Sequence, residues 1–146
     1  MIEIRKFELD DLEEVYEIEL SSFSIPWAKA DLHKDAFLND MSVYLVALCE
    51  GKIIGYAGMW HVVNEGHITN IAVCSEHRGK GAGQSLIDGL HKIAKEREMI
   101  GITLEVRMNN GPAQRLYMRN GYKVEGLRKN YYADTKEDAL IMWKYF

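Results

Sequence analysis

The chain has 146 residues, of which 47% are hydrophobic and 27% are charged, and its formal net charge is -4. This length and composition suit one globular domain over residues 1–146, and the acidic balance argues against nonspecific binding of nucleic acid. Apolar runs stay short of the about 20 residues that cross a bilayer, and acidic residues begin too early for a signal peptide, so we expect a cytoplasmic protein without a membrane partner.

The first half of the chain carries the patterns of three strands and two helices. Apolar residues at helical spacing from Leu12 to Phe23 predict a helix, and Pro26-Trp27 breaks that pattern. Glu50-Gly51-Lys52 is a short turn between two apolar runs and predicts a β-hairpin. We expect strands over 2–7, 42–50 and 53–63 and helices over 12–23 and 29–38.

The segment over 66–73 reads as a strand whose apolar phase slips. Ile68 falls on an even position, whereas Ile71 and Val73 fall on odd positions. Because a shift of one residue reverses the faces of a strand, the slip indicates a β-bulge near Asn70. Backbone groups left unpaired by a bulge are available to a ligand, and a loose strand end is the alternative interpretation.

The second half of the chain alternates helices and strands. Pro112 suits the first turn of a helix, and Gly121 suits its C-terminal end. We expect helices over 84–98 and 112–120 and strands over 102–108, 122–127 and 140–145. The elements predict an α/β or α+β fold, with a mixed sheet of about six to seven strands flanked by about four helices.

Between the slipped strand and the next helix lies the sequence R-G-K-G-A-G-Q, residues 78–84. It lacks the lysine and hydroxyl residue that end a P-loop, and Gln84 stands where a dinucleotide-binding turn has glycine or alanine. A glycine-rich turn at a helix N-terminus directs several backbone N–H groups toward one point, which suits a pyrophosphate. A plain turn with solvated cations is the alternative.

These residues resemble the GNAT acetyltransferases. N-I-A-V followed by R-G-K-G-A-G is similar to the acetyl-CoA signature of that family. The later run N-x-x-A-x-x-x-Y-x-x-x-G-Y also matches in order, whereas Cys74-Ser75 replaces an Asp-Pro-like turn. Pro26-Trp27, the L-E-V-R segment and the tail over 126–142 resemble, within the family, the bacterial ribosomal-protein alanine N-acetyltransferases.

The resemblance implies a splayed sheet and acetyl-CoA as the acetyl donor. It assigns the acetyl carbonyl to backbone N–H groups from Ile71 to Val73 and implies that Asn110 bonds the pantetheine arm, although Asn110 also suits an ordinary helix cap. It assigns the pyrophosphate to the glycine-rich turn. The cofactor-binding residues expected are Ile71, Ala72, Val73, Arg78, Gly79, Lys80, Gly81, Ala82, Gly83, Gln84 and Asn110.

Two side chains are candidates for proton transfer. Glu105 lies on the polar face of an apolar strand and is the candidate base, acting through a water; pairing with Arg107 is the structural alternative, and His67 is a rival base. Tyr117 matches the tyrosine of the family and is the candidate acid for the departing thiolate, although it also suits a core position. An α-amine needs only a modest base, because its pKa is about 7.7–8.0.

The acceptor side is expected at Pro26, Trp27, Tyr131 and Tyr132, which in the resembled group flank the N-terminus of a ribosomal protein. Acidic residues near the two tyrosines would suit a cationic peptide, and a solvated hairpin tip is the alternative. The expected reaction is direct attack in a ternary complex. A small-molecule amine or a lysine side chain as acceptor, and a CoA-binding regulatory module without catalysis, stay open.

The two cysteines, Cys49 and Cys74, have no metal-ligand spacing, so we expect free thiols and no metal. Cys74 and His77 are three residues apart, but no third group is evident that would orient the histidine. A covalent acetyl-cysteine intermediate is therefore disfavoured.

Overall fold

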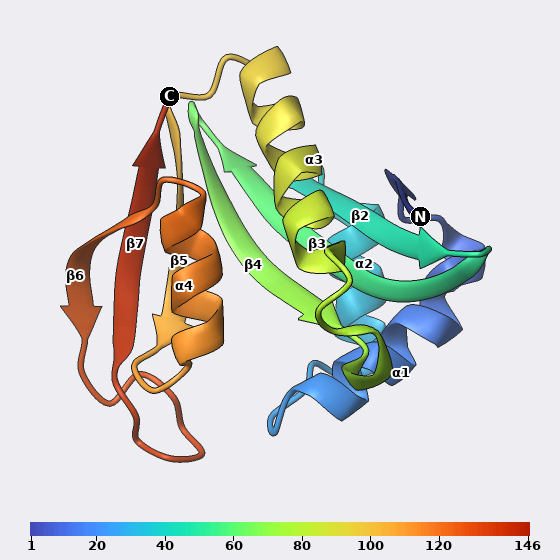
Figure 1. Ribbon diagram of the computed structural model, residues 1–146, viewed down its shortest axis with the longest axis horizontal. Coiled ribbons are helices and arrows are strands. Elements are labelled where there is room, and N and C mark those ends of the chain that lie inside the picture. The colour runs from blue at the N-terminus through green and yellow to red at the C-terminus, as the bar shows by residue number, and fades with distance from the viewer.

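The computed structural model describes residues 1–146, which form one seven-stranded mixed sheet with helices on both faces (Figure 1). The strands are β1 (Ile2–Lys6), β2 (Ser42–Cys49), β3 (Lys52–Val62), β4 (Glu65–Val73), β5 (Gly101–Arg107), β6 (Lys123–Arg128) and β7 (Ala139–Tyr145). The α-helices are α1 (Leu12–Ser22), α2 (Lys29–Leu38), α3 (Ala82–Glu96) and α4 (Gly111–Arg119), and short 3₁₀ turns cover Leu9–Asp11 and Ser75–His77. The expected fold class is confirmed.

The strand order is β1-β2-β3-β4-β5-β7-β6, and only β4 and β5 run parallel to each other. That parallel contact is short, because it pairs Glu65–His67 with Gly101–Thr103 and then stops. Beyond it the two strands diverge, as Figure 1 shows. The β4 edge from Ile68 to Val73 therefore has no strand partner on the β5 side.

The predicted bulge is confirmed in β4. Gly58 pairs with Asn70, and the next residue, Met59, pairs with Ile68, so Thr69 is the extra residue. The faces reverse across it as the slipped pattern indicates. Ile68 belongs to one hydrophobic cluster, and Ile71 packs against the same cluster although the two positions differ by an odd number.

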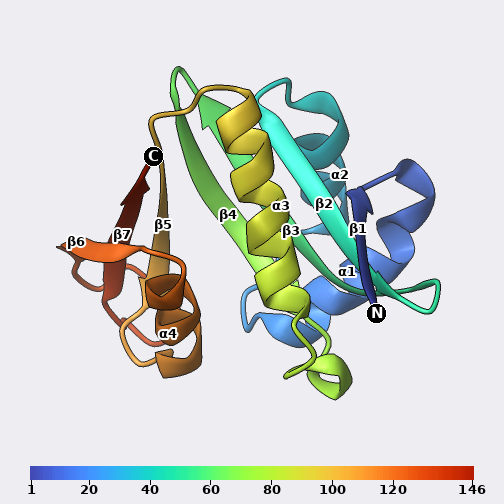
Figure 2. The same cartoon turned by 45° about the horizontal axis from the view of Figure 1, so that its top comes forward.

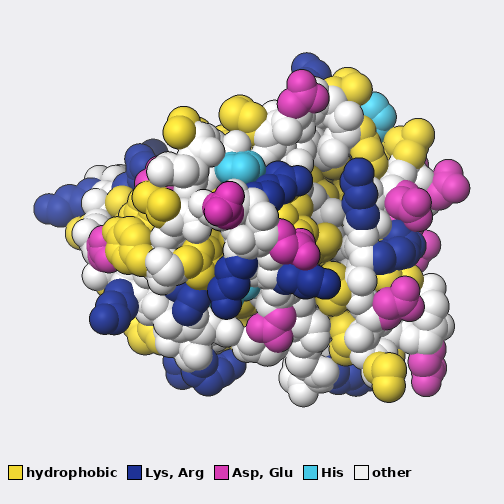
Figure 3. Space-filling model, turned by 90° about the horizontal axis from the view of Figure 1, so that it is seen from above, with side chains coloured by type: hydrophobic (Ala, Val, Ile, Leu, Met, Phe, Trp, Pro, Cys, Tyr) yellow, Lys and Arg dark blue, Asp and Glu magenta, His cyan; other side chains and the backbone are white.

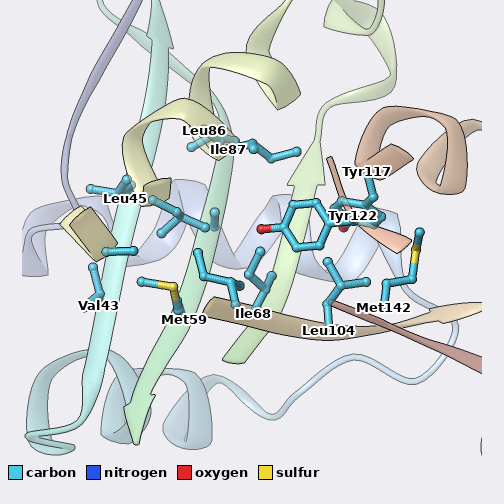
Figure 4. Close-up of a cluster of buried hydrophobic side chains, with 14 of the residues drawn as sticks. Val43, Leu45, Met59, Ile68, Leu86, Ile87, Leu104, Tyr117, Tyr122 and Met142 are labelled. Atoms are coloured by element: carbon cyan, nitrogen blue, oxygen red, sulfur yellow. The ribbon is translucent and has the colours of Figure 1, made fainter. Parts of the chain in front are cut away.

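Each face of the sheet has its own core. Helices α3 and α4 cover one face, where Leu86, Ile87 and Leu104 pack beside Tyr117 and Tyr122 (Figures 1, 2 and 4). Helices α1 and α2 cover the other face over a smaller cluster. The amphipathic pattern of α3 explains its position, because its apolar residues recur at helical spacing and all are buried except Ile93, which is partly buried.

All element ends lie within two residues of those expected. A difference of two residues occurs at α3, which begins at Ala82 rather than Gln84 because Gly81 is its N-cap with a φ of 89°. The last residues of the glycine-rich stretch are thus already helical. Positive and negative side chains are interspersed on the face drawn in Figure 3. No helix is both long and apolar enough to cross a membrane.

Candidate active site

A cleft of about 600 Å³ opens where β4 and β5 diverge. Its walls come from both faces of the sheet. Trp27 and Trp60 lie on the side of α1 and α2, whereas Tyr117 of α4 and Asn110, the N-cap of that helix, lie on the opposite face. Two different molecules can therefore approach the same point from opposite faces of the sheet.

The glycine-rich turn presents a run of free donors. Six consecutive backbone N–H groups, from Gly79 to Gln84, donate no hydrogen bond within the chain, and Ser85 N–H is the first to reach a helical carbonyl, that of Gly81. Gly79 and Gly81 have φ values of 80° and 89°. A Cβ on either glycine would meet nothing within 4 Å, so there is open space beside the turn. This arrangement fits a pyrophosphate.

The side chains around that turn have separate functions. Arg78 and Lys80 are exposed, and the guanidinium Nε of Arg78 donates to the Val73 carbonyl at 3.4 Å. Gln84 exchanges two hydrogen bonds with Asn120, at 2.7 and 2.9 Å. The glutamine that breaks the dinucleotide pattern therefore ties the start of α3 to the end of α4, while its backbone N–H stays free.

The two candidate bases lie together. His67 Nε2 and Glu105 Oε2 are 2.7 Å apart, because the short parallel contact brings β4 and β5 side by side at this level. Arg128 Nε lies 3.4 Å from the other carboxylate oxygen. The hydrogen bond from His67 is the main cause that lowers the pKa of Glu105; burial acts in the opposite direction, and the Arg128 charge lowers the pKa further.

Tyr117 lines the cleft from α4 and is only 8% exposed. Its ring packs edge-on against Tyr122 with centroids 5.7 Å apart, and Figure 4 shows the two rings next to each other. Its hydroxyl makes no hydrogen bond to another side chain. Burial is the main cause that raises the pKa of Tyr117, so this side chain stays protonated through the neutral range.

The loop between β6 and β7 forms one rim of the cleft. Arg107 stacks on Tyr132 with its guanidinium 3.9 Å from the ring centroid, and it also pairs with Asp134 at 2.9 Å and Glu137 at 3.4 Å. Ser24, in the loop between α1 and α2, donates to Asp134 across the rim. The Ser24 hydrogen bond and then Arg107 lower the pKa of Asp134 to about 2.

The acidic side chains of this loop, which were expected to suit a cationic peptide, are engaged with groups of the chain itself. Asp134 and Glu137 are engaged with Arg107, and Glu137 also accepts the backbone N–H of Asn109 at 2.7 Å. Asp138 accepts the backbone N–H of Asn130 at 2.8 Å. These carboxylates hold the loop in place, because their nearest donors belong to the chain itself.

Of the other residues expected in the site, some line the cleft and others lie outside it. Trp27, Tyr131 and Tyr132 line the cleft, as does Ile71. Pro26 does not line it, and the Ala72 side chain packs in the core under α1 and α2, while Ala72 pairs with Tyr56 of β3. Val73 packs against the other core.

Asn110 is the N-cap of α4, where its side-chain oxygen accepts the Ala113 N–H at 3.2 Å. It also lines the cleft, so its amide nitrogen is available there. Both cysteines are free thiols, as expected. Burial raises the pKa of Cys74, which disfavours the thiolate that a covalent route needs.

Three polar residues line the cleft although the sequence did not predict them as site residues. Glu19 is only 1% exposed. Its carboxylate accepts a hydrogen bond from the Trp27 backbone N–H at 2.9 Å and another from the Tyr56 hydroxyl. A signal was present, because Glu19 lies four residues after Val15 on the apolar stripe of α1. Thr69 and Asn70, at the bulge, also line the cleft.

Splayed strands around a cleft, with a free run of N–H groups beside it, define an enzyme class that binds a pyrophosphate-bearing donor. The model of the acetyltransferase (GNAT) family matches residues 12–122. The chain therefore belongs to the GNAT acetyltransferase family. Its acetyl donor is acetyl-CoA, and the free donors of the glycine-rich turn fit the pyrophosphate of that molecule.

Among similar proteins, one from Bacillus subtilis (strain 168) is 44% identical over 140 residues, which cover 96% of this chain and 93% of that protein; it is provisionally named a ribosomal protein bS18-alanine N-acetyltransferase. The Escherichia coli K12 ribosomal protein bS18-alanine N-acetyltransferase is 31% identical over 141 residues, 95% of this chain and 94% of that one.

Solved structures agree with this assignment. The crystal structure of the Escherichia coli ribosomal-protein-S18-alanine N-acetyltransferase superposes with a TM-score of 0.91 at 29% identity, covering 99% of this chain and 94% of that one. Ard1 from Thermoplasma volcanium gives a TM-score of 0.87 at 29% identity, with coverage of 99% and 97%.

Proposed function

We propose that this enzyme transfers the acetyl group of acetyl-CoA to the N-terminal α-amine of a protein, of the ribosomal-protein alanine type. The observation that carries the proposal is the cleft between β4 and β5, which holds a carboxylate–imidazole pair and a buried tyrosine and is lined from both faces of the sheet. The names of the Bacillus subtilis and Escherichia coli relatives support a ribosomal protein as the acceptor.

The donor approaches from the side of α3 and α4. The N–H groups from Gly79 to Gln84 bind the pyrophosphate, and Arg78 and Lys80 add positive charge beside it. The free edge of β4, over Ile71–Val73, offers N–H groups to the thioester carbonyl, where negative charge develops during attack. Asn110 donates its free amide nitrogen to the pantetheine arm.

Glu105 is the base of the reaction. The amine nitrogen attacks the thioester carbonyl carbon, and the proton that the nitrogen loses passes to Glu105 through a water. The hydrogen bond with His67 lowers the pKa of Glu105 and so keeps its carboxylate in the ionised form that accepts a proton. The imidazole and the carboxylate thus work as one unit instead of as rivals.

Tyr117 is the acid of the reaction. When the carbon–sulfur bond breaks, its hydroxyl proton passes to the departing thiolate of coenzyme A. Burial raises the pKa of Tyr117, and the same apolar surroundings raise the pKa of a thiol beside it, so transfer between the two stays feasible. The hydroxyl needs to break no hydrogen bond to another side chain before it donates.

The acceptor approaches from the side of α1 and α2. Trp27, Tyr131 and Tyr132 form apolar walls on that side, and Pro26 precedes Trp27 in the loop that carries it. Arg107 and Ser24 hold Asp134 and with it the opposite rim. The rims are therefore preorganised for an extended chain terminus.

The test offers acetyl-CoA to the enzyme with peptides of varied N-terminal residue, and in parallel with lysine-containing N-blocked peptides, polyamines and aminoglycosides. We expect acetylation of free peptide N-termini, located by fragmentation mass spectrometry. Acetylation of only small amines or lysine side chains would overturn the proposed acceptor. Binding of acetyl-CoA without transfer to any amine would indicate a regulatory module.

A further inference from the structure

Two buried polar atoms of the chain have no hydrogen-bond partner, and they belong to adjacent residues. They are Thr69 Oγ1 and Asn70 Oδ1. Buried side-chain polar atoms are nearly always paired in folded proteins, because an unpaired one loses its bonds to water without replacement. Both residues line the cleft, and Asn70 is only 6% exposed. The two unpaired oxygen atoms therefore indicate that a ligand binds at this point.

The bulge explains why two consecutive side chains share a face. In a regular strand neighbours point to opposite faces, but Thr69 is the extra residue opposite Gly58 and Met59. Thr69 Oγ1 lies 3.0 Å from the position that a Cβ on Gly58 would occupy, next to the Tyr44 ring. Asn70 contacts the Tyr56 hydroxyl, and both tyrosines belong to the core under α1 and α2. Thr69 and Asn70 thus lie on the acceptor side.

A directed chain of hydrogen bonds orients the Asn70 amide. The Tyr56 hydroxyl donates its only proton to Glu19, so it accepts from Asn70 Nδ2, at 3.3 Å. The amide nitrogen therefore faces Tyr56, and Oδ1 is left as a free acceptor. The second oxygen of Glu19 accepts the Trp27 N–H at 2.9 Å, so the same carboxylate holds the loop that carries Trp27.

We propose that Thr69 and Asn70 hold the attacking amine of the acceptor. This inference rests on the proposed function and deepens it. A primary amine that attacks with its lone pair has one N–H directed to the base and a second N–H that needs its own acceptor. Asn70 Oδ1 and Thr69 Oγ1 supply that acceptor, and the buried carboxylate of Glu19 behind them favours a group with positive charge. These residues position the amine, whereas Glu105 accepts its proton and Tyr117 protonates the departing thiolate.

The test uses Thr69→Val and Asn70→Ala in the full chain. Valine keeps the shape of threonine and removes an unpaired buried hydroxyl, so we expect Thr69→Val to melt at the same temperature as the wild type or higher. Its kcat/KM for the acceptor should nevertheless fall about tenfold, and that of Asn70→Ala about tenfold to a hundredfold, mainly through KM. The dissociation constant of acetyl-CoA, measured by calorimetry, should stay within about twofold.

Thr103→Val is the matched control. Thr103 is on the neighbouring strand, does not line the cleft, and its hydroxyl donates to the Met142 carbonyl at 3.0 Å. Because that hydrogen bond is satisfied, the control should melt at a lower temperature and keep its acceptor KM. The two valine variants are thus expected to change stability and acceptor kinetics in opposite ways.

Unchanged acceptor kinetics in both Thr69→Val and Asn70→Ala would overturn the inference, and so would an equal loss in Thr103→Val. The ratio of variant to wild type is measured with whichever amine the wild-type enzyme acetylates. Failure of the proposed function appears in the wild type, as a lack of peptide acetylation. Failure of this inference appears only in the ratio, so the two outcomes are distinguishable.

Discussion

Replacement of Glu105 by glutamine tests the base in the cleft. Glutamine keeps the shape of the side chain, which is 12% exposed, and removes the charge that accepts a proton. A positioned general base contributes about 10²–10⁴-fold to a rate. We therefore expect kcat/KM for the acceptor peptide to fall by about that factor at pH 7, equal to about 3–5 kcal/mol of activation free energy.

The deficit of Glu105→Gln should shrink as the pH rises. An α-amine with a pKa of about 8 is about one-tenth neutral at pH 7 and largely neutral at pH 9. The kcat/KM of the variant depends on the neutral fraction of the amine, so it should rise about tenfold from pH 7 to pH 9. The kcat/KM of the wild type should rise less, because Glu105 accepts the proton of the amine at both pH values. The assay follows release of the coenzyme A thiol.

Two neighbours of Glu105 serve as controls. The His67 hydrogen bond is the main cause that lowers the pKa of Glu105, so His67→Ala should raise this pKa and move the acid limb of kcat to higher pH. Arg128 is 54% exposed and should shift the limb less when replaced by glutamine. A Glu105→Gln variant within about twofold of the wild type at pH 7, or a deficit unchanged at pH 9, would refute the assignment.

Three further predictions concern the acid, the core and the surface. Tyr117→Phe should lower kcat about 10²–10⁴-fold and leave the melting temperature unchanged, since the hydroxyl makes no hydrogen bond to another side chain; a full kcat would contradict its role as acid. Gly58→Ala should lower the free energy of unfolding by about 1–3 kcal/mol in urea titration, because the new Cβ would lie 2.6 Å from the buried Tyr44 ring; equal stability would contradict this. Asp11→Asn should cost about 1 kcal/mol at pH 7 by breaking the two-bond pair with Arg5. Arg5 lowers the pKa of Asp11, so this cost should persist above the ordinary pKa and vanish as the pH falls through the lowered one; a pH-independent cost would exclude the charge as its source.

Local patterns in the sequence determined the element types and the chemistry of single positions. The slip between Ile68 and Ile71 predicted the bulge, because a strand with one buried set of side chains must keep its phase. The glycine-rich turn predicted an anion site, since its backbone geometry depends on a few adjacent residues. Glu105 and Tyr117 were named from their residue types and from a resemblance, and the structure places both in one cleft.

Only the tertiary structure decided which of these groups meet. His67 and Glu105 are 38 residues apart, and they pair because β4 and β5 are adjacent for a few residues before they diverge. Glu19 and Asn70 are joined through Tyr56 only when α1 packs on that face of the sheet. Contacts of this kind depend on strand order and on the side of the sheet that a helix covers. Periodicity reports which face of an element is buried, but it carries no information on which other element covers that face.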